Sequence, residues 1–118
     1  MLRLILMRHA KSDWTMSDPD HDRPLNPRGT ASAAALGRWL AARGHVPDQA
    51  LVSSSRRTRD TYDGLGLDLA PELRPEMYHA DPDTLWEVLR GASGHRVLLL
   101  GHNPGMAALA GQLCATAP

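Results

Sequence analysis

The sequence predicts an α/β fold in which a mainly parallel sheet is flanked by helices. Two apolar runs of strand length, Leu2 to Met7 and Arg96 to Leu100, end at glycine, histidine or charge, as strands buried on both faces do. A shorter candidate strand is Ala50 to Ser53. A segment with helical features follows each candidate strand, and this alternation is typical of parallel sheets.

The first strand leads through a polar loop, residues 11–23, to a helix over Thr30 to Arg43. Asn26 is placed to cap this helix, Pro27 fits its first position, and Gly44 supplies its C-terminal stop. Four residues recur at helical spacing and are expected on its buried face: Ala33, Leu36, Trp39 and Leu40.

Two further helices are expected after the second strand, a short one over Arg56 to Leu65 and a clearer one over Pro82 to Arg90. Asp81 is placed to cap the second of these, in which Trp86 and Leu89 share a face. Helical segments therefore alternate with strands along the chain.

The last strand runs into a turn over Gly101 to Gly105, which repeats the Asn-Pro helix start, and Met106 to Leu113 continues as helix. We find no internal repeat, low-complexity tract or linker. The length of 118 residues suits one compact domain, so residues 1–118 are expected to form a single domain.

Composition argues against several classes of partner and compartment. Lysine and arginine number 13, as do aspartate and glutamate, so no net field favours nucleic acid or an anionic membrane. Cys114 is the only cysteine, which precludes an intrachain disulfide and favours a reducing compartment. The N-terminal apolar run ends at Arg8 without a cleavage site, and no run approaches the roughly 20 residues that span a bilayer. We therefore expect a cytoplasmic protein.

Histidine and arginine side chains gather where the candidate strands end. The carboxyl ends of parallel strands meet at one edge of a sheet, where ligands bind. The segments at this edge are Arg8 to Ala10, Ser53 to Thr58 and Gly101 to Pro104. A tetrahedral dianion needs several fixed donors, and the arginine fork supplies them beside helix N-termini that open at the same edge. The sequence therefore predicts a phosphate pocket containing Arg8 and Arg57.

Two histidines are placed to act on a phosphoryl group in this pocket. Neutral imidazole is a good nucleophile near pH 7, and a covalent intermediate divides the transfer into two easier steps. We expect His9 to attack phosphorus. We expect His102, on another strand, to donate a hydrogen bond to the equatorial oxygens.

These segments resemble the histidine phosphatase superfamily, the phosphoglycerate mutase-like proteins, whose hallmark is Arg-His-Gly or Arg-His-Ala closing the first strand. Four motifs carry the resemblance in the family's order: Leu6 to Ser12, Arg23 to Gly29, Ser53 to Thr61 and Gly101 to Gly105. The small size looks like the SixA-type phosphohistidine phosphatase branch. The resemblance implies a three-layer sandwich around a central sheet and hydrolysis without a metal or other cofactor.

The resemblance also assigns roles to individual residues. His9 would carry the phosphoryl group, while Arg8, Arg57 and His102 would complete the phosphate pocket. Arg57 is preferred to its neighbour Arg56 because the family's arginine lies four residues before a threonine, as Arg57 does here.

Arg23 has two interpretations with even support. In the short phosphohistidine-directed branch, the arginine of the Arg-Pro-Leu motif contacts phosphate, which makes Arg23 a candidate substrate-binding residue. Alternatively, Arg23 is an ordinary salt-bridge partner of Asp20 or Asp22.

The sequence departs from the family in two places. Many relatives carry a glutamate as proton donor, but no motif chooses among Glu72, Glu76 and Asp81, so we name no general acid. Relatives also continue with a further strand, whereas this sequence stops at residues 116–118. An edge strand is then missing, and either another copy covers that edge, giving a homodimer, or a shortened chain has impaired stability and activity.

Other polar residues are expected to have structural roles only. Four histidines are interpreted as solvated loop residues: His21, His45, His79 and His95. Ser53 to Ser55 lack the glycines of a nucleophile elbow and are expected to cap the next helix, while Ser12 and Thr15 are expected to structure their loop. The histidines and acidic residues show no metal-ligand spacing, so we expect no metal.

The sequence therefore predicts a metal-independent phosphatase that acts on phosphohistidine in proteins through an intermediate on His9. One alternative is a phosphomonoesterase for small metabolites. The alternative from another class is a non-catalytic module that binds phosphate or a phosphoprotein.

Overall fold

Four parallel strands form a sheet in the part of the chain that the structure describes. The computed structural model describes residues 3–14 and 19–115. The strands are β1 (Arg3–Arg8), β2 (Gln49–Ser53), β3 (Glu72–Arg74) and β4 (Arg96–Gly101). Their order is β1-β4-β2-β3, and each neighbouring pair is parallel. The predicted parallel sheet is confirmed, and β3 is an addition whose three mostly exposed residues leave no apolar pattern.

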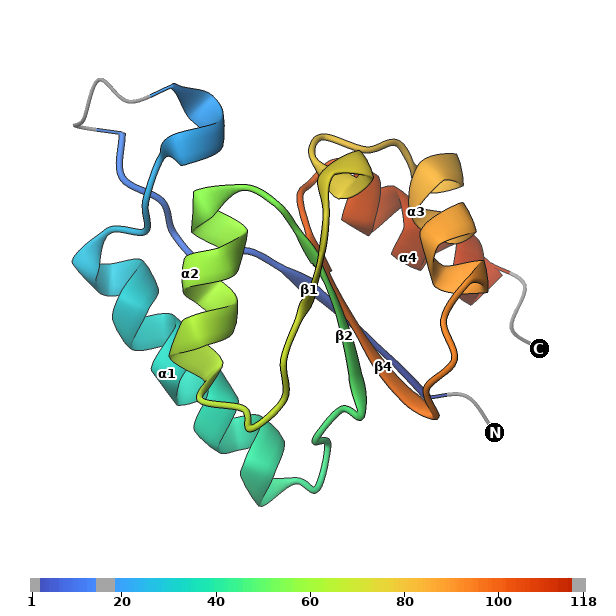
Figure 1. Ribbon diagram of the computed structural model, residues 1–118, viewed down its shortest axis with the longest axis horizontal. Coiled ribbons are helices and arrows are strands. Elements are labelled where there is room, and N and C mark those ends of the chain that lie inside the picture. The colour runs from blue at the N-terminus through green and yellow to red at the C-terminus, as the bar shows by residue number, and fades with distance from the viewer. Residues whose placement is uncertain (1–2, 15–18, 116–118) are drawn as a thin grey trace.

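Helices cover both faces of this sheet, which confirms the three-layer arrangement. The helices are α1 (Pro27–Ala42), α2 (Arg56–Leu65), α3 (Pro82–Arg90) and α4 (Gly105–Ala115). Two short 3-10 turns, η1 (Asp20–Asp22) and η2 (Pro75–Met77), lie in the connections. Figure 1 shows α1 and α2 together on one face and α3 and α4 together on the other.

The central strand β4 has a buried core on each of its faces. Alternate side chains of a strand point to opposite faces, so an uninterrupted apolar run serves two cores. Leu98 and Leu100 join the core beneath α1 and α2, whereas Val97 and Leu99 join the core beneath α3 and α4. This double burial explains why the strand reads as a continuous apolar run.

The predicted helix caps are confirmed. The Asn26 side-chain oxygen accepts a hydrogen bond from the Gly29 amide at 2.7 Å, and the Asp81 carboxylate accepts one from the Thr84 amide at 2.8 Å. Because Asn26 satisfies a free amide of the first turn, α1 begins at Pro27, the residue predicted for its first position.

Two tryptophans are less buried than the helical pattern predicts. Trp39 is 47% exposed and Trp86 is 43% exposed, so the prediction that Trp39 belongs to the buried face of α1 was wrong. The Trp39 indole lies at the border of that face, 5.8 Å from the His45 ring and 5.3 Å from the Arg43 guanidinium. Helical periodicity predicts the face on which a side chain lies, but the neighbouring elements decide how much of that side chain they bury.

Some sequence predictions concern residues outside the described ranges, namely Leu2, Thr15 and the chain end at residues 116–118. Within the described residues, β1 and β3 are the edge strands, and a homodimer through a sheet edge stays a prediction. No described helix combines the length and the apolar character needed to cross a membrane.

Helix α1 approaches α2 closely at Gly37, and we expect Gly37→Ala to destabilise the fold. A Cβ at this position would overlap the backbone carbonyl oxygen of Leu65. Overpacking of this kind costs about 1–3 kcal/mol of unfolding free energy. Gly111→Ala in α4 is the matched control, because a Cβ there meets no atom within 4 Å, and it should stabilise the protein by about 0.5–1 kcal/mol. Urea unfolding measures both, and equal stability of the two variants would contradict the close approach.

Candidate active site

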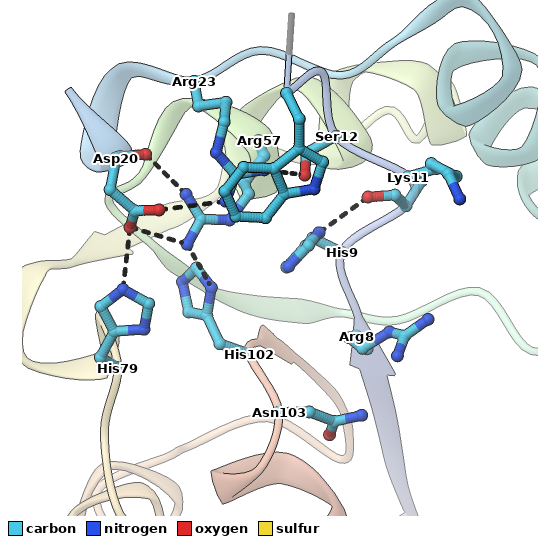
Figure 2. A pocket seen from close by; sticks show the side chains of 12 residues that line it. Arg8, His9, Lys11, Ser12, Asp20, Arg23, Arg57, His79, His102 and Asn103 are labelled. Atoms are coloured by element: carbon cyan, nitrogen blue, oxygen red, sulfur yellow. Dashed lines mark hydrogen bonds and ion pairs between the residues drawn. The ribbon is translucent and has the colours of Figure 1, made fainter. Parts of the chain in front are cut away.

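The pairing of β1 with β4 places two histidines side by side at the carboxyl edge of the sheet. Arg8 is in register with Gly101, and the His9 amide donates to the Gly101 carbonyl at 3.1 Å. The next residue on each strand is a histidine, and the His9 and His102 ring centroids are 5.3 Å apart. Both rings line a pocket of about 420 Å³ together with the other predicted site residues (Figure 2).

His9 is held in one tautomer by the backbone. Its Nδ1 lies 2.7 Å from the Ala10 carbonyl oxygen, which can only accept, so Nδ1 carries the proton and neutral His9 has its lone pair on Nε2. Burial lowers the pKa of His9, and the positive charge of Arg57 lowers it further. His9 is therefore a neutral imidazole with a free nucleophilic nitrogen.

Thr61 links the backbone beside His9 to helix α2. The Thr61 hydroxyl accepts from the Ala10 amide at 3.0 Å and donates to the Arg57 carbonyl at 2.7 Å. One buried hydroxyl thus joins the backbone beside His9 to the first turn of α2. This contact gives a physical reason for the four-residue spacing between Arg57 and a threonine.

His102 is buried, at 3% exposure, and its tautomer is fixed by its neighbours. The Arg57 Nη2 atom can only donate and lies 3.4 Å from Nδ1, so Nδ1 accepts and Nε2 donates to the Ser53 hydroxyl at 2.8 Å. Burial lowers the pKa of His102 to about 3, and the charge of Arg57 is the next cause. In the free protein, His102 is neutral.

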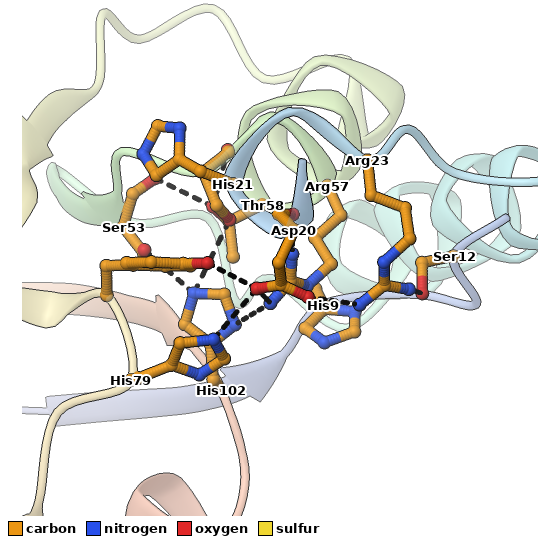
Figure 3. Close-up of polar contacts among 12 residues, drawn as sticks. His9, Ser12, Asp20, His21, Arg23, Ser53, Arg57, Thr58, His79 and His102 are labelled. Atoms are coloured by element: carbon orange, nitrogen blue, oxygen red, sulfur yellow. Dashed lines mark hydrogen bonds and ion pairs between the residues drawn. The ribbon is translucent and has the colours of Figure 1, made fainter. Parts of the chain in front are cut away.

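The serines at the end of β2 orient side chains instead of capping α2. Ser55 stands at the N-cap position, but its hydroxyl contacts the Thr58 hydroxyl at 2.7 Å and makes no capping hydrogen bond. The Ser54 hydroxyl lies 2.9 Å from His21 Nε2, so His21, whose side chain is partly exposed on η1, has a partner that the sequence did not predict. Figure 3 shows Ser53 and Arg57 beside His102, which contacts both.

Two arginines lie almost wholly buried in the pocket. Arg57 is 2% exposed, and Arg23 is 5% exposed beneath the Trp14 ring, whose centroid is 3.5 Å from its guanidinium carbon. Arg23 donates to the Ser12 hydroxyl and, at 3.0 Å, to the Asp20 carboxylate. Arg23 therefore pairs with Asp20, as one interpretation predicted, and it also lines the pocket, while its contact with substrate stays a prediction.

Arg8 occupies a different position from the other two arginines. It is exposed and lies at the rim of the pocket. In Figure 2 its side chain extends from the end of β1 away from Arg57 and His102. Arg8 therefore contributes positive charge near His9 without a direct contact to the buried pair.

Asp20 contacts four other side chains at the pocket. The sequence did not indicate it as a site residue. Its carboxylate accepts hydrogen bonds from Tyr78, His79, Arg23 and Arg57, with 2.8 Å to His79 Nε2 and 3.2 Å to Arg57 Nη2. The hydrogen bond from Tyr78 is the largest cause that holds the pKa of Asp20 well below its usual range. Asp20 is therefore ionised at neutral pH.

His79 is exposed and lies in a turn, as predicted for a solvated loop residue, and it also belongs to the pocket. It lines the pocket, and its ring centroid is 5.3 Å from that of His102. Its φ of 52° lies in the left-handed region, which non-glycine residues rarely adopt. No periodicity or motif in the sequence marks this residue, because the turn that places it depends on packing.

The Arg-Pro-Leu-Asn-Pro-Arg-Gly segment anchors the loop that follows His9. The Asp13 amide donates to the Pro24 carbonyl at 2.8 Å, and the Asn26 amide donates to the Lys11 carbonyl at 3.0 Å. Gly29 permits this approach, since a Cβ there would overlap the Lys11 carbonyl oxygen. The segment therefore fixes both Ser12 and Arg23 beside the pocket.

The acidic residues weighed as proton donors lie elsewhere. Glu72 accepts from the Gln49 side chain at 2.7 Å, Asp81 caps α3, and the pocket lining includes none of Glu72, Glu76 and Asp81. Among residues 3–14 and 19–115, no group of three histidine, cysteine or acidic side chains is arranged to hold a metal ion.

Comparison with known proteins agrees with this fold and pocket. A family model described as histidine phosphatase superfamily (branch 1) matches residues 4–81. A protein of Mycobacterium tuberculosis without assigned function is 39% identical over 106 residues, which cover 88% of this chain and 67% of that relative. The chain belongs to the histidine phosphatase superfamily.

Solved structures of SixA proteins share the fold. The crystal structure of a candidate phosphohistidine phosphatase SixA from Agrobacterium tumefaciens has a TM-score of 0.89 at 32% identity, covering 95% of this chain and 76% of that one. The protein histidine phosphatase SixA complexed with tungstate has a TM-score of 0.81 at 25% identity, covering 93% of this chain and 75% of that one. The chain thus spans about three quarters of each of these two structures.

The lowered pKa of His102 predicts that its ring stays neutral between pH 8 and pH 5. Because its ordinary pKa of 6.5 applies in the unfolded chain, the unfolded state binds more protons between pH 6.5 and about 3. The unfolding free energy should therefore fall as the pH is lowered through this window, by at most about 1.4 kcal/mol per pH unit from this residue.

Ring nitrogen NMR combined with urea unfolding at several pH values checks this prediction. His102→Gln should flatten the pH dependence of stability in this window. A His102 ring that titrates with a midpoint near 6.5 would show that the burial argument fails.

Proposed function

We propose that this protein is a phosphatase that hydrolyses a phosphoryl group through a phosphohistidine intermediate on His9. One observation carries the proposal. The unprotonated Nε2 of His9 shares a single pocket with two nearly buried guanidiniums, Arg23 and Arg57. A nucleophile beside fixed cations is the arrangement that in-line phosphoryl transfer requires.

In the first step, His9 Nε2 attacks phosphorus and forms a nitrogen–phosphorus bond. The bond to the leaving group breaks, and its electron pair goes to the departing atom. Arg57 and Arg23 hold the equatorial oxygens, whose charge must be balanced in the transition state, and Arg8 adds positive potential at the rim. The Nδ1–H bond to Ala10 keeps the His9 ring aimed during attack.

His102 responds to the arriving charge. In the free protein its Nδ1 lone pair faces Arg57, so it has no proton on that atom to donate. A phosphoryl dianion offsets the charge of Arg57 and favours a second proton on His102. The imidazolium then donates from Nδ1 to a phosphoryl oxygen while Ser53 holds its other nitrogen.

In the second step, water attacks phosphorus from the side that the leaving group has vacated. The nitrogen–phosphorus bond breaks, the electron pair returns to His9, and inorganic phosphate is released. Likeness to a SixA protein that binds tungstate, a tetrahedral oxyanion, supports this use of the pocket.

We infer that the substrate is phosphohistidine in a protein, with Arg23 as a substrate-binding residue. Likeness to SixA structures supports this substrate class. The pocket chemistry also supports it, because the carboxylate in the pocket, Asp20, is held ionised and cannot protonate a leaving group. Imidazole departs with less protonation than an alkoxide needs, so a pocket of this kind favours phosphohistidine over alkyl esters.

His9→Ala should abolish release of phosphate from a phosphohistidine peptide in the presence of a chelator. Loss of the nucleophile lowers kcat by about 10³-fold or more. His95→Ala is the matched control, since His95 is an exposed histidine outside the pocket. Equal rates for wild type and His9→Ala would refute the mechanism. Phosphate binding without turnover by the wild type would indicate a binding module, and turnover of small esters alone would indicate a phosphomonoesterase.

Arg57→Lys should lower kcat/KM by about 10²-fold, because lysine keeps the charge but loses the fork that reaches two acceptors. Arg56→Lys is the matched control at the neighbouring position, where the guanidinium is exposed and lies 3.7 Å from the Asp60 carboxylate. Steady-state kinetics on both variants test the assignment, which fails if the two substitutions have the same effect.

A further inference from the structure

The arginines of the pocket already have an anionic partner in the free protein. Asp20 Oδ1 accepts from Arg23 at 3.0 Å, and Asp20 Oδ2 accepts from Arg57 at 3.2 Å. The Asp20 backbone carbonyl accepts from the other terminal nitrogen of Arg57 at 2.7 Å. Figure 3 shows the carboxylate among the donors that a phosphoryl group needs.

Burial makes such a partner necessary. Guanidiniums that are 2% and 5% exposed are costly without a counter-charge, and Asp20 supplies it. Asp20 itself is half-exposed and stands on the short turn η1, so its carboxylate is less constrained than the arginines. Of these three groups, the carboxylate is the one most easily exchanged.

Asp20 does not satisfy every hydrogen-bond donor of the two arginines. The Nε atoms of Arg23 and Arg57 are both buried and have no hydrogen-bond partner. A carboxylate offers two oxygens, whereas a phosphoryl group offers three and carries more charge. A phosphoryl group can therefore replace Asp20 at the arginines with a gain in charge balance.

We propose that Asp20 is an exchangeable counter-anion of the reaction. It occupies Arg23 and Arg57 in the free protein, yields them to the substrate phosphoryl group, and takes them back when inorganic phosphate leaves. The inference rests on the proposed function, since it concerns the same pocket. His79 gives the carboxylate a partner of its own while the arginines hold phosphate.

If Asp20 only positioned the arginines, its removal would change phosphate affinity in the opposite direction. A residue that only positions Arg23 and Arg57 would improve phosphate binding, so its removal would weaken binding. A counter-anion competes with phosphate, so its neutralisation strengthens binding and slows release of the product. The sign of the change in phosphate affinity therefore separates the two roles.

Asp20→Asn keeps the shape of the side chain and removes its charge. We expect it to bind inorganic phosphate at least roughly tenfold more tightly than wild type, because a charge-assisted hydrogen bond no longer competes. In turnover, KM should fall while kcat is unchanged or lower. Asp22→Asn is the matched control, because Asp22 lies on the same turn, contacts His21 and removes the same charge. Its phosphate affinity should change by less than about threefold, since an exposed charge is screened.

Tyr78→Phe provides a second variant that leaves every charge in place. It removes one hydrogen bond from the Asp20 carboxylate, so phosphate should displace that carboxylate more easily and bind more tightly. Circular dichroism on each variant verifies folding before calorimetry with inorganic phosphate.

These binding measurements can be judged separately from the turnover assay of the proposed function, because binding of inorganic phosphate requires no catalysis. Tighter binding by Asp20→Asn and Tyr78→Phe, with Asp22→Asn unchanged, supports the counter-anion. Equal or weaker binding by Asp20→Asn overturns it while leaving the His9 mechanism intact. Absence of phosphate binding by the folded wild type overturns both.

Discussion

The parallel pairing of β1 with β4 is the constraint on which the site depends. Because Arg8 is in register with Gly101, the residues that follow, His9 and His102, leave the sheet at the same edge and at the same height. Backbone hydrogen bonds of the ladder bring the two residues together, and the hydrogen bonds of each ring then hold the ring centroids 5.3 Å apart. A one-residue slip would exchange the side chains of β4 between its two cores, so the close packing of those cores makes this register costly to shift.

Electrostatic balance is the second constraint. A pocket that holds two buried guanidiniums must have an anion at all times, either its own or that of a ligand. Asp20 meets this requirement in the free protein, where burial and the charge of Arg57 keep His102 neutral. The polar contacts around Ser53, Thr58 and Thr61 form a frame that holds these charges while one anion replaces another.

Local signals in the sequence were sufficient for most of the fold. Apolar runs located β1, β2 and β4, and the Asn26 and Asp81 caps located the starts of two helices. These signals did not predict features that depend on tertiary packing. Strand β3 is too short and too polar to show a pattern, and Trp39 faces a layer too narrow to cover its indole. Both failures arise from neighbours that are distant in the sequence.

For the site, the sequence by itself placed His9, His102 and Arg57 at one pocket, because the carboxyl ends of parallel strands share one edge and the motifs stand at those ends. Only the tertiary structure decided the tautomers of His9 and His102 and the entry of Asp20 and His79 into the pocket. Asp20 and His79 are 59 positions apart, and their contact depends on how η1 packs against the turn after η2. Such a contact leaves no local pattern, since neither residue needs its partner to satisfy the propensities of its own segment.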